Sequence, residues 1–100
     1  MFFKEYLDEL YYEELLNNYD YNYLNTIDYD NFKKIYDLLI KYEFNYIEDI
    51  ILKYISIFEL EPNYLERCIL KYKEKLGTNY VKIMGNDMRY FNAIIDKDEK

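Results

Sequence analysis

Apolar residues recur at helical spacing along almost the whole chain. Between Phe3 and Leu15 the positions 3, 7, 10, 11 and 15 form one apolar stripe. Residues three, four and seven apart lie on the same face of an α-helix, so this spacing predicts an amphipathic helix. The opposite arc carries Glu5, Asp8, Glu9, Tyr12 and Glu13. The predicted helix therefore has an acidic outer face.

Two further helices follow. Asp28 or Asp30 is placed to cap the first of them, because a carboxylate accepts hydrogen bonds from the free N–H groups of a helix start. Its apolar stripe is Phe32, Ile35, Tyr36, Leu39 and Tyr42. A second stripe, Ile47, Ile50, Ile51, Tyr54 and Phe58, predicts one helix from about Asn45 to Leu60.

The last part of the chain predicts two more helices. Pro62 suits the first turn of a helix, where its missing N–H has no partner to lose, and Gly77 suits the end. The buried face of this helix is predicted as Leu65, Cys68, Ile69, Tyr72 and Leu76. Val81, Met84, Met88, Phe91 and Ile95 continue the spacing, and Gly85 marks a point where the final segment can split, because glycine weakens a helix. Residues 96–100 are charged and predict a frayed tail.

The chain also resembles itself at a period of about 34 residues. Tyr11 to Tyr19 matches Tyr46 to Tyr54 in register, and Tyr80-Val81 begins a third copy. We therefore predict an all-α fold of about five helices, in which antiparallel helix pairs stack as a short helical repeat or a small bundle. One domain spans residues 1–95, and residues 1–31 form its acidic, tyrosine-rich third.

One segment resembles a known family of helical repeats. Ile50 to Phe58, then Leu60-Glu61-Pro62, then Leu65 to Leu76 with Gly77, resemble the helix, turn, helix, Leu-Gly sequence of mitochondrial transcription termination factors (mTERF-like repeats). The resemblance covers about half the chain, and Ile55 stands where that family typically has proline. It implies a helical-repeat shape. The family's nucleic-acid binding does not follow, because it uses basic repeats that this chain lacks.

Size and cysteine content narrow the class of protein. One hundred residues with 51% hydrophobic side chains suffice for one folded domain. The single Cys68 cannot form an internal disulfide, and no long apolar run or basic leader indicates membrane insertion or export. We expect a cytoplasmic protein, monomeric or homodimeric.

Charge is concentrated at one end of the chain. Residues 1–31 carry eight carboxylates against Lys4 alone, so they account for the whole net charge of -7, and they hold seven of the fifteen tyrosines. An acidic surface with tyrosines suits contact with a basic protein, although acidity that serves only solubility is the alternative. The predicted partner-binding residues are Glu5, Asp8, Glu9, Tyr12, Glu13, Asp20, Tyr21 and Tyr23.

Residues for catalysis are few. There is no histidine, serine occurs once as Ser56, and both glycines are isolated, so a histidine-activated nucleophile and a glycine-rich phosphate loop are excluded. Asp28-Tyr29-Asp30-Asn31 begins like a calcium loop, but Lys33 replaces the required glycine and Leu39 the bidentate glutamate. We expect no enzyme activity, no metal and no cofactor.

Three functions remain open. The first is an acidic inhibitor, of the immunity-protein or phage anti-defence type, that docks on a basic nucleic-acid-handling protein or toxin and mimics nucleic-acid phosphates. The second is a structural helical repeat that self-associates. The third is direct nucleic-acid binding through Lys33, Lys34, Lys41, Lys71, Lys73 and Lys75, which the net charge disfavours.

Overall fold

The computed structural model describes residues 1–98, and in this range the chain forms only helices, turns and loops. The all-α prediction is confirmed. The α-helices are α1 (Glu9–Asn18), α2 (Tyr21–Asn25), α3 (Tyr29–Lys41), α4 (Ile47–Lys53), α5 (Pro62–Leu76), α6 (Tyr80–Asn86) and α7 (Arg89–Asp98). Three short 3₁₀ helices join them: η1 (Phe2–Glu5), η2 (Ile55–Glu59) and η3 (Gly77–Asn79).

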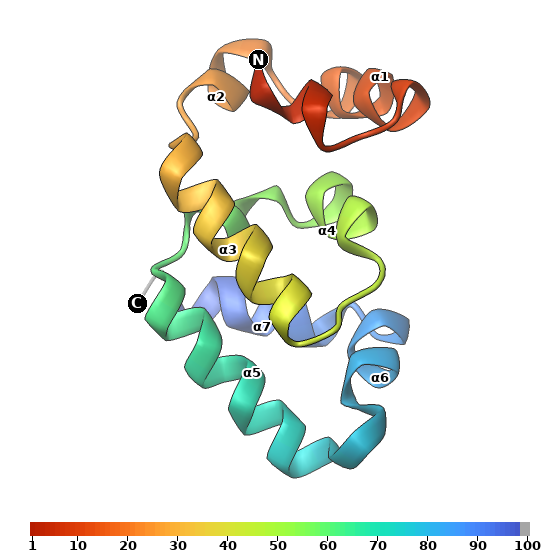
Figure 1. The fold of residues 1–100 in the computed structure, drawn as a ribbon, viewed down its shortest axis with the longest axis vertical. Coiled ribbons are helices and arrows are strands. Elements are labelled where there is room, and N and C mark those ends of the chain that lie inside the picture. Colours follow the sequence, from red (N-terminus) through yellow and green to blue (C-terminus); the bar gives the residue numbers. More distant parts are fainter. Residues whose placement is uncertain (99–100) are drawn as a thin grey trace.

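The helices pack as a small bundle of 37 × 28 × 22 Å. Helix α1 lies with α2 at one end of the long axis, and the C-terminal half of α5 lies at the other (Figure 1). Between these ends α1 packs on α4, α3 packs on η2 and α5, and α7 packs on η2. The η2 segment is therefore central to the bundle.

Element boundaries recur at the predicted period. Helix α2 (Tyr21–Asn25) and η2 (Ile55–Glu59) begin about 34 residues apart, and α3 and α5 begin about 33 residues apart. Helices α4 and α6 are also separated by about 33 residues. The recurring unit thus has three parts, a helix, a short helix and a long helix: α1, α2 and α3, then α4, η2 and α5. The sequence pattern predicted units of two helices.

The continuous helix predicted between Phe3 and Leu15 is wrong. Asp8 has extended backbone and accepts a hydrogen bond from the Tyr11 amide, so it caps α1 and separates it from η1. Phe3, Leu7 and Leu15 are buried as predicted, but Leu10 is 77% exposed. The phase of the helix is set by the cap at Asp8, and a stripe counted from Phe3 therefore misplaces Leu10.

The single helix predicted from Asn45 to Leu60 is also wrong, because it breaks at Tyr54 into α4 and η2. The buried side chains here are too closely spaced to lie on one side of a single helix: they are Ile50, Ile51, Leu52, Ile55, Ile57, Phe58 and Leu60. One straight helix would expose some of them. A helix followed by a 3₁₀ turn buries all of them.

Three other predictions hold. Asp28 caps α3 through the Asn31 amide, and Pro62 occupies the first turn of α5, which ends at Gly77 with a positive φ of 81°. The last segment splits, but at Asp87, just after Gly85, and Met88 is exposed where the stripe predicted burial. Helix α7 continues to Asp98, which covers part of the predicted frayed tail, and residues 99 and 100 lie outside the described residues.

Tyrosine hydroxyls link separate elements by donating to backbone carbonyls. Tyr19 donates to Leu52 at 2.9 Å, and Tyr80 donates to Tyr42 at 2.9 Å. Tyr64 donates to Ile94 and Tyr46 to Val81. Each bond joins residues at least 30 positions apart, so these tyrosines are part of the structure that holds the bundle together.

Candidate protein-binding face

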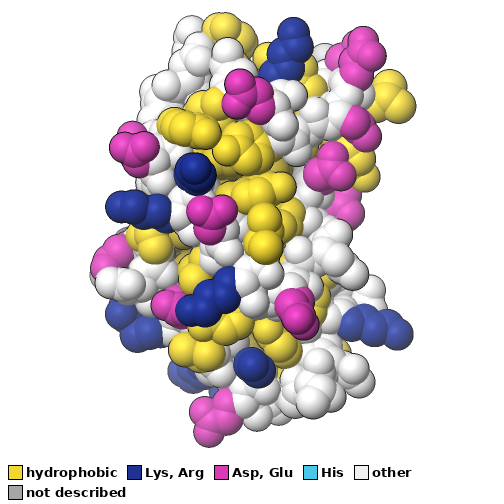
Figure 2. All heavy atoms as spheres, in the orientation of Figure 1, with side chains coloured by type: hydrophobic (Ala, Val, Ile, Leu, Met, Phe, Trp, Pro, Cys, Tyr) yellow, Lys and Arg dark blue, Asp and Glu magenta, His cyan; other side chains and the backbone are white. Residues whose placement is uncertain are grey.

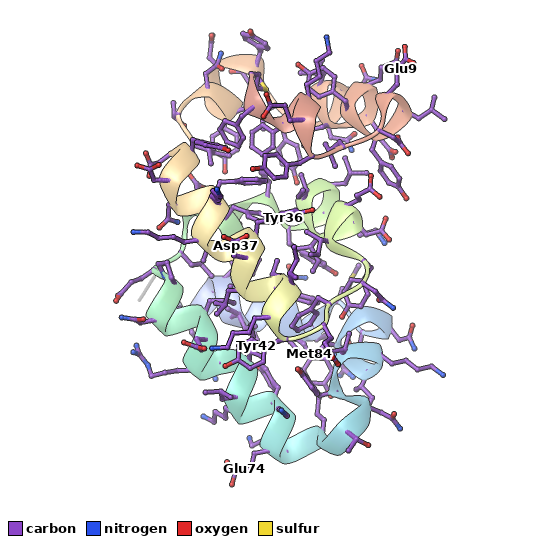
Figure 3. The ribbon with its side chains drawn as sticks, viewed as in Figure 1. Glu9, Tyr36, Asp37, Tyr42, Glu74 and Met84 are labelled. Atoms are coloured by element: carbon purple, nitrogen blue, oxygen red, sulfur yellow. The ribbon has the colours of Figure 1, made fainter. Side chains whose placement is uncertain are left out.

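The predicted acidic residues lie at the surface of the α1 end. Glu5, Asp8, Glu9, Glu13 and Asp20 are all exposed. Glu9 projects from the outer side of α1, at the opposite end of the molecule from Glu74 of α5 (Figure 3). On the face in view, several acidic side chains lie at the α1 edge while others are scattered over the rest of the face, and most lysines and arginines lie in the half away from α1 (Figure 2).

Two of these carboxylates also have a local structural role. Asp8 caps α1, and Asp20 caps α2 by accepting a hydrogen bond from the Asn22 amide at 3.1 Å. A capping carboxylate satisfies amides that have no partner within the helix and favours its positive end. Glu5, Glu9 and Glu13 have no such bond in the described structure, which leaves their oxygens free for a partner.

The predicted tyrosines differ in how far they are available. Tyr21 is 55% exposed. Tyr23 is half-buried, and its hydroxyl donates to Glu59 at 2.7 Å. Burial and this carboxylate raise the pKa of Tyr23. Tyr12 is half-buried against the core. Tyr21 is thus the most accessible ring of the three.

No lysine or arginine neutralises this face in the described part of the chain. The ion pairs there are Lys41 with Glu66 at 3.2 Å and Arg89 with Asp87 at 2.7 Å. Both lie outside residues 1–31. The field of the N-terminal carboxylates is therefore not cancelled by contact with cations from the later helices.

The structure adds two acids from α4 to this face. Glu48 Oε2 lies 3.4 Å from the Asp8 amide nitrogen, and Asp49 Oδ1 lies 3.5 Å from the Tyr11 hydroxyl. Asp49 raises the pKa of Tyr11. Glu48 and Asp49 were not among the predicted binding residues, because they lie far from residues 1–31 along the chain. The match of Tyr11 to Tyr19 with Tyr46 to Tyr54 was a usable signal, since the helices that carry these segments, α1 and α4, pack side by side.

Beside these acids is a groove of about 490 Å³. We call it the tyrosine groove; among the residues that line it are Tyr6, Tyr11, Tyr36, Tyr46, Glu48 and Asp49. Tyr36 belongs to α3 and lies on its side toward α4 (Figure 3). No lining residue is basic. Aromatic rings and carboxylates around an open groove offer a cation both ring faces and negative charge.

Hydrogen bonding orders part of this groove. The hydroxyls of Tyr6 and Tyr29 lie 3.0 Å apart, and this contact, together with burial, raises the pKa of Tyr6 to about 12. The Tyr6 ring also packs edge-on against Tyr36, with centroids 4.9 Å apart. Rings that are fixed by their neighbours lose little conformational entropy when a partner binds.

Metal-binding side chains do not cluster in the described residues. No three His, Cys, Asp or Glu side chains there come together as a metal site. None of the helices described has the length and apolar character needed to cross a membrane. What the geometry offers is charge and aromatic surface, which suits binding.

Comparisons place no known protein beside this one: no family model, no curated protein and no solved structure matches the chain. The class that fold and surface define is a small all-α protein with an acidic, tyrosine-bearing face.

Proposed function

We propose that this chain is a non-catalytic, cytoplasmic binding protein whose acidic face docks on a basic surface of a nucleic-acid-handling protein. The acidic face comprises Glu5, Glu9, Glu13, Glu48 and Asp49, with the tyrosine groove beside them. An inhibitor of the immunity-protein or phage anti-defence type would have this size and charge. The observation that carries the proposal is that these carboxylates are gathered at one end without an ion-paired cation in the described structure.

The spacing of the acids supports mimicry of nucleic-acid phosphates. Glu9 and Glu13 are four residues apart on α1, so they lie on one face about 6 Å apart along the axis. A groove that binds phosphates presents lysines and arginines that would pair with such carboxylates. The tyrosine groove would accept one basic side chain of the partner through its ring faces. Charge complementarity of this kind mainly accelerates association and selects the partner.

The test is a charge reversal with a matched control. The variant Glu9→Lys/Glu13→Lys removes the acidic face, and Glu74→Lys/Asp96→Lys changes the net charge equally at exposed positions outside it. Immobilised wild type should capture a basic nucleic-acid-binding protein from a lysate at 50 mM salt and release it at 500 mM salt, because screening weakens contacts between exposed charges. The first variant should lose this capture and the control variant should keep it.

Two results would contradict the proposal. Equal capture by both charge variants would mean that only net charge matters. Capture of nothing basic by the wild type would leave acidity as a solubility feature. Inhibition of the captured enzyme by wild type, and its loss in Glu9→Lys/Glu13→Lys, would distinguish an inhibitor from a passive ligand.

A further inference from the structure

A basic groove lies between α5 and α7, in the half of the molecule away from α1 (Figure 1). Its cations are Arg67, Lys71, Lys75 and Lys97. The first three are spaced four residues apart on one face of α5, and no lining residue is acidic. All four are exposed, and in the described part of the chain none has an ion pair. Its volume is about 270 Å³.

The floor of this basic groove is apolar. Cys68 and Ile94 line it together with the ring of Tyr72, which packs edge-on against Tyr90 at 5.2 Å. Pockets that hold small ligands typically have about 300–1,000 Å³, so this groove is slightly smaller than that range and has room for an apolar side chain. It suits an apolar side chain with carboxylates around it.

The same molecule presents such a feature on α1. Leu10 is 77% exposed, the highest value among the large hydrophobic side chains. Glu9 precedes it, and Glu13 and Glu14 follow one turn later, all exposed. Leu10 with its three glutamates is therefore complementary to the basic groove in both polarity and charge.

We propose that α1 of one copy docks into the basic groove of a second copy, with Leu10 on the apolar floor and Glu9 and Glu13 facing Arg67 and Lys71. Helix α1 lies at one end of the long axis, whereas α5 and α7 lie in the other half of the molecule (Figure 1), so α1 does not reach the basic groove of its own chain. The contact is head-to-tail, and contacts of this kind form rings or open chains. A nucleic-acid strand is the other occupant with matching charge. The net charge of -7 opposes both occupants, but α1 adds an exposed leucine that matches the apolar lining of the groove.

The affinity between two copies should be low, and it should decrease at high salt. One helix face buries less than the roughly 1,000 Å² expected of a stable interface. At about 0.15 M salt the repulsion between net charges is screened beyond about 8 Å, whereas groups in contact still attract. At 1 M salt these contacts weaken too. Sedimentation velocity should therefore show a mass that rises with concentration at 0.15 M and much less at 1 M.

Substitutions can test the contributions of α1 and of the basic groove separately. Leu10→Gln keeps the charge and should weaken self-association about tenfold, whereas Leu70→Gln, exposed on α5 outside the basic groove, should leave it unchanged. Glu9→Lys/Glu13→Lys and Arg67→Glu/Lys71→Glu should each be monomeric alone. Mixed in equal amounts they should associate, because each restores the charges that the other lacks.

Cys68 gives an independent readout, because it is the chain's single thiol and lines the basic groove. Its reaction with a disulfide reagent should slow as wild-type concentration rises, and should not slow for Leu10→Gln. Circular dichroism checks that each variant is folded.

Three outcomes would overturn the inference: a wild type that stays monomeric at every concentration, an oligomer that survives Arg67→Glu/Lys71→Glu, or monomers that bind a labelled oligothymidylate through the basic groove. The last would indicate nucleic-acid binding. Because Arg67→Glu/Lys71→Glu leaves the acidic face intact, it should still capture a heterologous basic protein, so failure here is distinguishable from failure of the proposed function.

Discussion

Replacing Gly85 by alanine should destabilise this protein, although alanine is the better helix former. Gly85 lies in α6, where alanine would contribute about 0.5–1 kcal/mol. An added Cβ would lie 2.7 Å from Cε1 and 2.8 Å from Cζ of Tyr46. The Tyr46 ring is held by its hydrogen bond to Val81 and by edge-on packing against Phe44 and Phe91. The ring therefore cannot move away without losing this hydrogen bond or these ring contacts.

The costs of the clash exceed the gain in helix propensity, so the free energy of unfolding should fall. Overpacking of a core typically costs about 1–3 kcal/mol, and loss of the Tyr46 hydrogen bond adds about 1 kcal/mol. After the gain in helix propensity is subtracted, the net expectation for Gly85→Ala is a destabilisation of about 1–3.5 kcal/mol. For a domain of this size each kcal/mol lowers the melting temperature by about 4–8 °C, which thermal unfolding followed by circular dichroism resolves.

A double-mutant cycle tests the cause. Leucine lacks the atoms that the new Cβ would meet, so in a Tyr46→Leu background Gly85→Ala should be neutral or stabilising. Gly77→Ala is the control: Gly77 has a positive φ of 81° and nothing within 4 Å of its added Cβ, so alanine there should destabilise equally in both backgrounds. A Gly85→Ala variant that melts above the wild type, or an effect that does not depend on Tyr46, would refute the reasoning.

Three other predictions concern the polar contacts of the fold. Asn31→Ala should cost about 2 kcal/mol in urea denaturation, since its Nδ2 donates to the carbonyls of Phe58 and Leu60; a loss below about 0.5 kcal/mol would show that water replaces it. Asp28→Ala should cost about 1 kcal/mol through the lost α3 cap, whereas the neighbouring Asp30→Ala should be nearly neutral. Contacts to Tyr29 and Glu66 raise the pKa of Tyr6 and Tyr42, respectively, to about 12. Stability should therefore stay constant up to about pH 10, the ordinary tyrosine pKa, and should fall between about pH 10 and pH 12. The unfolded chain then releases protons that the folded chain retains; constant stability up to pH 11.5 would contradict this.

The parts of the fold that the sequence predicts well are those with strong local signals. Asp28 and Pro62 mark helix starts by chemistry that works within one turn, and α3 and α5 begin where expected. Asp8 has the same chemistry but was assigned to the outer face of a longer helix. The error arose because the stripe from Phe3 to Leu15 continues through a break that periodicity cannot detect.

The candidate site was predictable only in its N-terminal part. Local charge indicated Glu9 and Glu13, which the structure leaves exposed and unpaired in the described residues. Glu48 and Asp49 join that face through packing of α4 on α1, a contact between segments about 40 residues apart. The basic groove likewise needs α7 to place Lys97 beside α5. Such pairings follow from the tertiary arrangement and not from local pattern.

The hydroxyl-to-carbonyl bonds between distant elements have a consequence for how uniquely this chain folds. A core filled with rings could settle in many arrangements of similar energy, because flat apolar groups slide past one another at little cost. A phenol that must reach one particular carbonyl, as Tyr19 reaches Leu52 and Tyr80 reaches Tyr42, is satisfied in only one of them. In other packings these hydroxyls would lose their acceptors, so the tyrosines that make such bonds favour one arrangement of the core.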